Sequence, residues 1–319
     1  MAKEMAEPQA IIFSKRSFLF LSLGIGVFLV LSLYGDWWSV SKAFTSFSYA
    51  TLPVILGLAF MNYLSRFWRW ELYLKRVNIS LTRKNSFLIF MSGLVMTITP
   101  GKMGELLKSY LLKEGHNVPL ARSGPIVFAE RFTDLLAIYL LTLLGGISFT
   151  YGAGLLWVGL SVLVLALLPL FFPNLFHGLL NILKSFSWGR RLETPLQEAY
   201  QTLHELMGLR LLLGASLLGL IAWFFECLAF QMVFKGLGLE ISLFKATFIY
   251  AFSTLAGALS MLPGGIGAAE GSMAGLLLMV EIPKAKATTA TIIIRVCTVW
   301  FAVILGYGFL RAYRKNKSL

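Results

Sequence analysis

Long apolar stretches recur along the whole chain and are separated by short polar or charged segments. A helix needs about 20 apolar residues to cross roughly 30 Å of hydrocarbon, so stretches of this length are typical of membrane spans. Six of them meet the requirement, at residues 17–35, 49–70, 123–149, 154–173, 211–234 and 287–310. The pattern therefore predicts an all-α polytopic membrane protein, with residues 1–319 forming a single integral membrane domain.

Two further apolar stretches, 86–99 and 246–262, are each followed by a Pro-Gly pair. The first would make a helix of only about 21 Å, which is too short to cross a bilayer alone. Backbone that leaves the helix at this depth must face protein or a water-filled cavity. We therefore expect two re-entrant broken-helix pairs, which together with the six spans give about eight membrane segments.

Charge gives the orientation and excludes one class of partner. The chain is 57% hydrophobic and only 13% charged, with a net charge of +13. Most of the Lys and Arg residues fall on the side that carries the N terminus, so the positive-inside rule predicts cytoplasmic N and C termini. Basic loops that face anionic lipid headgroups account for the net charge, and nucleic-acid binding is not expected. The predicted location is the cytoplasmic membrane, crossed several times.

A charged amphipathic stretch at 176–208 divides the chain into a first half, about 49–150, and a second half, about 211–312. We expect this linker to lie on the cytoplasmic membrane surface as an amphipathic helix. Similar features recur in the two halves at an offset near 163 residues. They are an Ile-Ser-Leu triplet (79–81 and 241–243), the Pro-Gly pairs, a Gly followed by Glu105 or Glu270, and an Arg 25 or 26 residues later, Arg131 or Arg295.

The two halves are predicted to enter the membrane from opposite faces. The first broken helix follows a basic cytoplasmic segment, whereas the second follows an odd number of crossings and starts outside. This predicts inverted-topology repeats, the arrangement in which transporters build a binding site near the middle of the membrane. The alternative is chance similarity between two apolar segments that are each broken by Pro-Gly.

Several charged residues lie within the apolar segments, where an ionised side chain costs about 2.5–3.5 kcal/mol on insertion scales. In the sequence AERFTDLL, Glu130 and Asp134 share a helix face with Arg131 and are expected to hold its guanidinium. Arginine suits phosphate because its planar fork binds two oxygens at once. The candidate substrate-binding residues are Lys102, Glu105, Glu130, Arg131, Asp134, Glu270 and Arg295.

The two helix breaks offer a second feature suited to anions. A helix that starts after a break points free backbone N–H groups, and the positive end of its dipole, toward the cavity. Lys102 in the first break has no counterpart in the second, since Gly265 stands at its place, so we expect the first break to make the tighter headgroup contact. The residues expected to form the breaks are Pro100, Gly101, Gly104, Pro263, Gly264, Gly265 and Gly267.

The charged residues also allow a structural interpretation. Glu105 with Arg131, and Glu270 with Arg295, could be ion pairs that lock the repeats together without touching substrate. Glu226 is alone in its segment and is either a proton-coupling carboxylate or the hydrogen-bond partner of a neighbouring hydroxyl; we favour the hydroxyl.

Two other features have structural interpretations as well. The run RFWRWELYLKR at 66–76 is interpreted as an interfacial belt, with aromatic rings at headgroup depth and Arg and Lys reaching toward water. Cys227 and Cys297 lie inside apolar segments and are expected to be buried thiols, since they form no CxxC motif. No metal site and no cofactor are expected.

Three motifs, TPGKMGELLKSYLL, AERFTDLL and LPGGIGAAEG, together with Arg295 in the last helix, carry a family resemblance. Over about residues 15 to 312 the chain resembles the lysylphosphatidylglycerol synthase transmembrane family, flippase-like proteins related to the membrane half of the bacterial multiple peptide resistance factor. The resemblance implies a lipid translocase that uses the candidate substrate-binding residues named above. No soluble aminoacyl-transfer domain follows residue 312, so lipid synthesis is not expected.

The leading hypothesis is a flippase that moves a phosphate-bearing lipid (aminoacylated, glycosylated or polyprenyl) between leaflets through a polar cleft. A small-anion or solute transporter on the same plan is the main alternative. An intramembrane lipid-modifying enzyme is disfavoured because the sequence offers no DxD, no clustered His or Cys ligands and no nucleophile–base pair. The expected partner is a membrane lipid with an anionic headgroup, and a separate lipid synthase or glycosyltransferase and a homodimer are left open.

Overall fold

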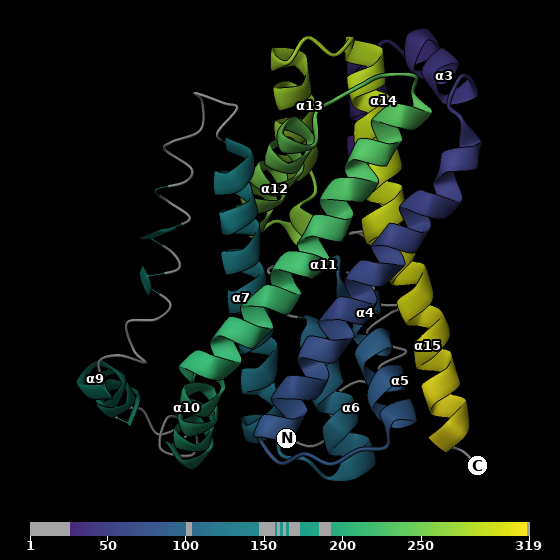
Figure 1. Ribbon diagram of the computed structural model, residues 1–319. Coiled ribbons are helices and arrows are strands. Elements are labelled where there is room, and N and C mark those ends of the chain that lie inside the picture. Colours follow the sequence, from purple (N-terminus) through teal and green to yellow (C-terminus); the bar gives the residue numbers. More distant parts are fainter. Residues whose placement is uncertain are drawn as a thin grey trace.

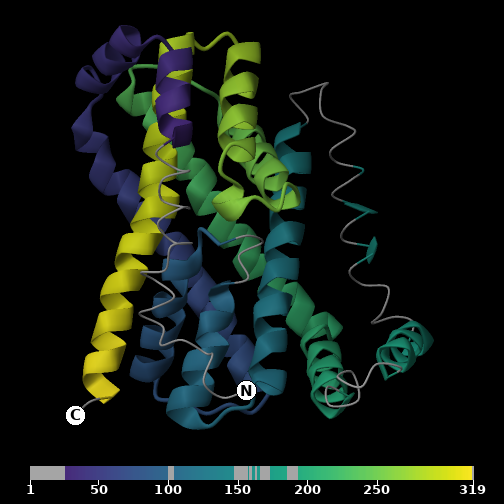
Figure 2. The same cartoon turned by 180° about the vertical axis from the view of Figure 1, so that it is seen from behind.

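The computed structural model describes residues 26–99, 104–146, 173–184 and 193–317, and five isolated positions between 157 and 165. Throughout these residues the regular structure is helical, which confirms the predicted class. Long helices run along the molecule and short helices cluster at its two ends (Figures 1 and 2). Of the predicted span at 17–35, residues 26–34 are helical. The beginning of that span and nearly all of the span at 154–173 lie outside the described residues.

Three helices in the described part of the chain are long and apolar enough to cross a membrane. The first is Tyr49–Arg76, formed by η1 (Tyr49–Thr51) and α4 (Leu52–Arg76), and the second is α11 (Leu209–Gly236). The third, Lys284–Asn316, combines α14 (Lys284–Arg295), the π-helical segment η6 (Val296–Trp300) and α15 (Phe301–Lys317). These helices coincide with the predicted spans at 49–70, 211–234 and 287–310.

Helix α7 (Leu120–Gly146) corresponds to the predicted span at 123–149 but has a different character. Its 27 residues give a length of about 40 Å, which exceeds the hydrocarbon thickness. It also concentrates charge near its middle, at Glu130, Arg131 and Asp134, and so it is not among the three apolar helices. The charges face other parts of the protein, as described below. The number of membrane crossings therefore stays a prediction.

Helices α4 and α11 lie side by side and run in opposite directions (Figure 1). The Asn62 side chain donates a hydrogen bond of 2.9 Å to the Ala222 carbonyl across this contact. The short helix α3 (Trp37–Thr45) lies near the end where α11 finishes, and there the Ser48 N–H donates to the Gly236 carbonyl at 2.8 Å. The pair α4–α11 therefore joins the two halves along their length.

The ends of α4 and α11 have the same cap. After α4, Asn78 has a positive φ of 54° and the Ile79 N–H donates to the Leu74 carbonyl at 3.0 Å. After α11, Gly238 has a φ of 64° and the Leu239 N–H donates to the Phe234 carbonyl at 2.9 Å. This 6→1 bond after a left-handed residue is a Schellman motif, which satisfies carbonyls at the helix end.

The helices that follow these caps also start alike. Thr82 and Ser242 each accept a hydrogen bond of 3.3 Å from the backbone N–H three residues later, which satisfies one of the unpaired donors at a helix start. Thr82 therefore corresponds to Ser242 in space. This correspondence is shifted by two residues from the Ile-Ser-Leu match, so the local alignment of that triplet was wrong.

Each of these caps leads into a helix hairpin. Helix α5 (Arg83–Gly93) continues into η2 (Leu94–Met96), and α6 (Leu107–His116) returns toward the end of the molecule where α5 began. Helix α12 (Leu243–Leu259) leads to the turn η5 (Pro263–Gly265), and α13 (Ala268–Met279) returns toward the opposite end (Figures 1 and 2). The tips meet inside the molecule: a Cβ added to Gly264 would lie only 3.4 Å from the Ile98 Cα.

Each hairpin packs against the last long helix of the other half. Helix α12 lies on α7, where a Cβ added to Gly145 would lie 2.5 Å from the Phe248 backbone nitrogen. Helix α5 with η2 lies on α15, where a Cβ added to Gly306 would overlap the Val95 backbone nitrogen. Small residues at such contacts let helix backbones approach closely, as is common in membrane proteins. Cys227 and Cys297 are buried free thiols, as expected.

The linker differs from the single amphipathic helix that we expected. It contains two described helices, α9 (Pro173–Lys184) and α10 (Glu193–Leu206), at the end of the molecule where α5 and α6 lie (Figure 1). Helix α10 packs against α7 with Leu206 buried, so apolar contact with the protein holds it. The Phe176 and Tyr200 rings, one from each helix, stack with 3.8 Å between their centroids.

Candidate functional site

Arg131 on α7 binds two carboxylates. Its Nη2 lies 2.9 Å from Glu105 Oε2 and 3.0 Å from Asp134 Oδ2. Glu105 comes from the turn that precedes α6, so the return of the first hairpin is attached to α7. The Arg131 side chain is 20% exposed, whereas the two carboxylates are buried. The structure thus brings together three of the predicted site residues and leaves the guanidinium accessible.

Two arginines on α4 complete this group. Arg69 Nη2 lies 2.6 Å from Asp134 Oδ1, and Arg66 Nη2 lies 3.4 Å from Glu105 Oε1. Both side chains are buried, which corrects the interpretation of residues 66–76 as an interfacial belt. Arg66, Arg69, Trp70 and Tyr73 share one helix face because they are three or four residues apart, and that face points into the protein. The exposed Trp68 lies on the other face.

Glu130 does not hold Arg131 as predicted. Its carboxylate instead binds the ammonium of Lys108 on α6, which also lies 3.5 Å from Glu105 Oε2. The Lys108 ammonium lies over the rings of Trp70 and Phe90, 4.9 and 5.2 Å from their centroids. The prediction was wrong because successive residues on a helix point in different directions: Glu130 faces α6 and Arg131 does not.

These contacts form a buried cluster of four cations and three carboxylates among the described residues. Taking ions out of water costs several kcal/mol each, so such a cluster needs close pairing to persist. Some of its donors are nevertheless unused: the Nε atoms of Arg66 and Arg131 are buried without a hydrogen-bond partner. The cluster therefore has one positive charge in excess and donors left over for another anion. Its members are Arg66, Arg69, Lys108, Arg131, Glu105, Glu130 and Asp134.

Arg66, Arg69 and Lys108 were missed in the sequence. Lys108 lies in the same motif as Lys102, at i+3 from Glu105, a spacing that allows an ion pair on a helix. Arg66 and Arg69 are also three residues apart, on the helix face that carries Tyr63, Trp70 and Tyr73. That shared face was the available signal, because a face of aromatic residues is typical of buried packing.

In the second half, Glu270 and Arg295 form the corresponding pair. Arg295 Nε lies 2.6 Å from Glu270 Oε1, and its Nη2 donates to the Gly264 carbonyl at 2.6 Å. Glu270 Oε2 accepts the Gly267 N–H at 2.7 Å. This corrects part of the anion-site prediction, because the start of α13 is already covered by the carboxylate of its own Glu270. An acidic side chain in the first turn is stabilised there by the helix dipole.

The glycines of the second break are needed for its shape. Gly264, Gly265 and Gly267 have φ values of 60°, 67° and 91°, which other residues rarely adopt. In the first break, the Gly104 N–H donates to Thr99 Oγ1 at 2.8 Å. Pro100, Gly101 and Lys102 lie outside the described residues, so the predicted contact of Lys102 with a headgroup remains a prediction.

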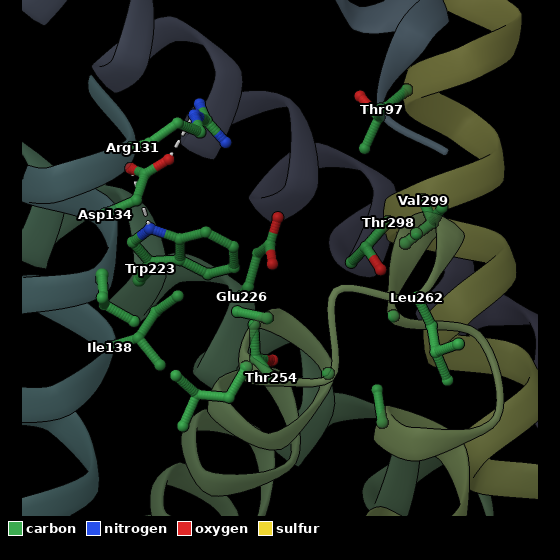
Figure 3. A pocket seen from close by; sticks show the side chains of 18 of the residues that line it. Thr97, Arg131, Asp134, Ile138, Trp223, Glu226, Thr254, Leu262, Thr298 and Val299 are labelled. Carbon is green, nitrogen blue, oxygen red and sulfur yellow. Dashed lines mark hydrogen bonds and ion pairs between the residues drawn. The ribbon is translucent and has the colours of Figure 1, made fainter. Parts of the chain in front are cut away.

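A cavity of about 450 Å³ lies between the two halves and receives side chains from both. Figure 3 shows Arg131 and Asp134 on one side of it, Glu226 near its centre, and Thr298 and Thr97 on the other side. Arg66 and Arg295 also line it. Three apolar lining residues, Phe128, Met261 and Leu262, are 47%, 62% and 44% exposed, so the cavity reaches the outer surface between α7 and the tip of the second hairpin.

The wall beyond the arginines is formed by hydroxyl groups and one carboxylate. The Tyr250 hydroxyl donates to Glu226 Oε2 at 2.5 Å, which supports the interpretation of Glu226 as the partner of a hydroxyl. Trp223 Nε1 donates to Asp134 Oδ1 at 3.1 Å and so links this wall to the arginine cluster. Thr254 and Thr298 face the same space (Figure 3).

The fold and the cavity define a class, namely helical membrane proteins with a charged internal cavity. A model of the family described as the lysylphosphatidylglycerol synthase TM region matches residues 19–306. The chain therefore belongs to this family, which confirms the resemblance carried by its motifs.

Curated relatives come from archaea and share the name UPF0104 membrane protein. The protein PH1989 of Pyrococcus horikoshii is 26% identical over 336 residues, covering 94% of this chain and 98% of that protein. MJ1595 of Methanocaldococcus jannaschii is 26% identical over 82% of this chain and 84% of its own length. A protein of Methanothermobacter thermautotrophicus is 36% identical over 97 residues, which is 30% of this chain and 29% of that protein. These names state a membrane location and no activity.

Proposed function

We propose that the protein moves a phosphate-bearing lipid between the two leaflets of the cytoplasmic membrane. The observation that carries the proposal is the cavity between the halves, in which Arg66 and Arg131 face a space that reaches the outer surface beside exposed apolar residues. The headgroup occupies the cavity while the acyl or prenyl tails stay in the bilayer.

The arginine wall fits a phosphate. Arg66 and Arg131 belong to a cluster with one excess positive charge and have Nε donors without partners. A phosphate oxygen accepts such donors, and charge-assisted bonds of this kind are roughly twice as strong as neutral ones. The bound phosphate also compensates the excess charge in a region where an uncompensated ion is costly. These features support an anionic headgroup as the ligand.

The mouth of the cavity fits a lipid better than a free anion. Phe128 on α7 and Met261 and Leu262 at the tip of the second hairpin both line the cavity and lie exposed. An apolar mouth lets the tails remain in hydrocarbon while the headgroup is inside, whereas a pore for small anions has no need of one. The small-anion alternative is therefore left to the experiment.

We infer that the halves are inverted repeats and that their hairpins are re-entrant. Four observations support this inference. The helix caps after α4 and α11 are alike, the hairpins point inward from opposite ends, and each half contains a Glu–Arg pair. Each half also has a left-handed residue two positions before a proline that starts the last helix, Asn117 before Pro119 and Glu281 before Pro283.

In this arrangement the N and C termini are cytoplasmic, and rocking of one half against the other exposes the cavity to each side in turn. The swapped packing of each hairpin on the other half makes such a movement cooperative. The protein moves lipid without changing it chemically, so a separate synthase or glycosyltransferase supplies the substrate. The family's printed description, which refers to lysylphosphatidylglycerol synthase, supports a lipid-related role.

Reconstitution into vesicles tests the proposal. Purified protein is incorporated into phosphatidylcholine vesicles that hold traces of chain-labelled phosphatidylglycerol or phosphatidic acid, and leaflet exchange is followed by extraction with albumin. We expect exchange that is much faster than in protein-free vesicles. No acceleration with any phospholipid, aminoacyl-lipid or polyprenyl phosphate would refute the proposal. Movement of inorganic phosphate without lipid would favour a small-anion transporter, and chemical conversion of the lipid would favour an enzyme.

A further inference from the structure

We propose that Glu226 takes up one proton with each lipid phosphate that enters the cavity, so that lipid movement is coupled to a transmembrane pH difference. The proposal rests on the proposed lipid transport and adds its driving force. It follows from the charge balance of the buried groups and from the position of Glu226 in the cavity opposite Arg131 (Figure 3).

The charged groups buried around the cavity are balanced among the described residues. The cluster of the first half has one positive charge in excess, and Arg295 in the second half is matched by Glu270. Glu226 is buried and supplies the remaining negative charge across the cavity. With Glu226 ionised, five cations therefore stand against five carboxylates, as Arg66, Arg69, Lys108, Arg131 and Arg295 against Glu105, Glu130, Asp134, Glu226 and Glu270.

A lipid phosphate changes this balance. A phosphodiester brings one negative charge, and when it binds Arg66 and Arg131 it replaces Glu226 as the counter-charge of the arginine cluster. An uncompensated buried charge costs several kcal/mol, so a proton that neutralises Glu226 stabilises the loaded state. On release the arginines regain Glu226 as counter-charge and the proton leaves.

Glu226 is the carboxylate best placed to change protonation state. The other four carboxylates lie in salt bridges with Arg or Lys at 3.0 Å or less. The printed hydrogen bond of Glu226 comes from the Tyr250 hydroxyl, which can donate to a carboxylate and also accept from a carboxylic acid. The contact with Tyr250 thus survives protonation, whereas protonation of any other member would break an ion pair.

The neighbours of Glu226 come from every helix that packs on its part of α11. They set the conditions for the exchange, because the positive groups favour the carboxylate in the empty cavity and the aromatic and hydroxyl groups stabilise the neutral acid. These neighbours are Tyr63 and Arg66 on α4, Asp134 on α7, Tyr250 on α12, Arg295 on α14, and Cys297 and Thr298 in η6.

The stoichiometry gives a quantitative expectation. One proton that accompanies one monoanionic lipid moves no net charge, so the membrane potential has no effect on the distribution. A difference of one pH unit is a tenfold difference in proton activity and drives about a tenfold ratio of the lipid between leaflets at equilibrium. The lipid accumulates in the leaflet that faces the more alkaline side.

The experiment uses wild-type protein in phosphatidylcholine vesicles with a trace of chain-labelled phosphatidylglycerol, at pH 7 inside and pH 6 outside. We expect inward accumulation approaching tenfold, which an ionophore that exchanges K⁺ for H⁺ abolishes and a potassium diffusion potential leaves unchanged. Chain-labelled phosphatidylethanolamine, which carries its own ammonium group, is expected to show no accumulation. Rapid exchange of phosphatidylglycerol that stays equal in both leaflets, or equal accumulation of both lipids, would overturn the coupling and leave lipid transport intact.

Two variants locate the coupling on Glu226. Glu226→Gln is permanently neutral, so it is expected to exchange phosphatidylglycerol without accumulating it. Glu240→Gln removes an exposed carboxylate outside the cavity and is expected to accumulate lipid as the wild type does. Accumulation by Glu226→Gln would overturn the assignment. The wild-type measurement stands by itself if a variant does not fold, and absence of all exchange by the wild type would refute the proposed transport as well.

Discussion

Arg131 Nη2 lies 2.9 Å from Glu105 Oε2, and this contact attaches the return of the first hairpin to the middle of α7. Glu105 also receives Arg66 at 3.4 Å and Lys108 at 3.5 Å, so one carboxylate is shared by cations from α4, α6 and α7. Because Arg131 alone of these side chains is partly exposed, the same contact that fixes the hairpin also presents a guanidinium to the cavity. Structural ion pairing and ligand binding are therefore compatible at this position.

The Lys108–Glu130 pair is expected to be structural. Lys108→Met leaves the Glu130 carboxylate buried without its cation, which costs about 3–5 kcal/mol when a buried ion pair loses one partner. The double variant Lys108→Met/Glu130→Gln removes both charges and is expected to recover a large part of that loss. The free energy of unfolding in detergent, measured for each single variant and the double variant, checks this coupling.

A suitable control lies on the same helix. Lys113 is exposed on α6, so Lys113→Met is expected to change stability by no more than about 0.5 kcal/mol. If the losses of Lys108→Met and Glu130→Gln simply add in the double variant, the two residues do not act as a pair.

The close approach of α15 to the first hairpin gives a second prediction. A Cβ at Gly306 would overlap the Val95 backbone, which cannot move away as a flexible side chain can. Gly306→Ala is therefore expected to destabilise the protein by about 1–3 kcal/mol or more. Gly308, two residues away on the same helix, has open space around it and serves as the matched control. Gly308→Ala is expected to be neutral or slightly stabilising, and equal melting temperatures for the two variants would show that α15 and η2 are not in contact.

The opposite orientation of the hairpins is testable by labelling. Lys84 at the start of α5 and Glu240 before α12 are both exposed and lie at opposite ends of the molecule. In intact cells, a membrane-impermeant maleimide is expected to label Glu240→Cys, and to label Lys84→Cys only after permeabilisation. The native Cys227 and Cys297 are buried, so they add little background. Labelling of both introduced cysteines from one side would exclude inverted repeats.

The sequence predicted those parts of the site that depend on local pattern. Glu105 with Arg131, and Glu270 with Arg295, were placed together because each pair has the same spacing after a helix break. The hydroxyl partner of Glu226 was also anticipated, since a single carboxylate in an apolar helix needs a donor nearby. These inferences need only the knowledge that an ionised group in the membrane must find a partner.

Other parts depended on contacts that no local pattern specifies. The run at 66–76 has the composition of an interfacial belt, and its burial follows only from the position of α4 against α7 and α11. Glu130 was assigned to Arg131 because Lys108, its actual partner, is brought close by the return of the hairpin. The caps of α4 and α11 correspond two residues away from the Ile-Ser-Leu match, because capping depends on backbone conformation more than on residue identity.

The central claim is that the arginine wall of the cavity carries the lipid headgroup, and the exchange rate of Arg131→Ala tests it most directly. Phosphatidylglycerol exchange in vesicles is compared with that of Arg210→Ala, which removes an exposed arginine outside the cavity. Loss of one charge-assisted contact, worth about 1.5–3 kcal/mol, is expected to slow exchange about tenfold or more in Arg131→Ala, and Arg131→Lys is expected to be intermediate because it keeps the charge but not the fork. Exchange by folded Arg131→Ala at the rate of Arg210→Ala would contradict the account.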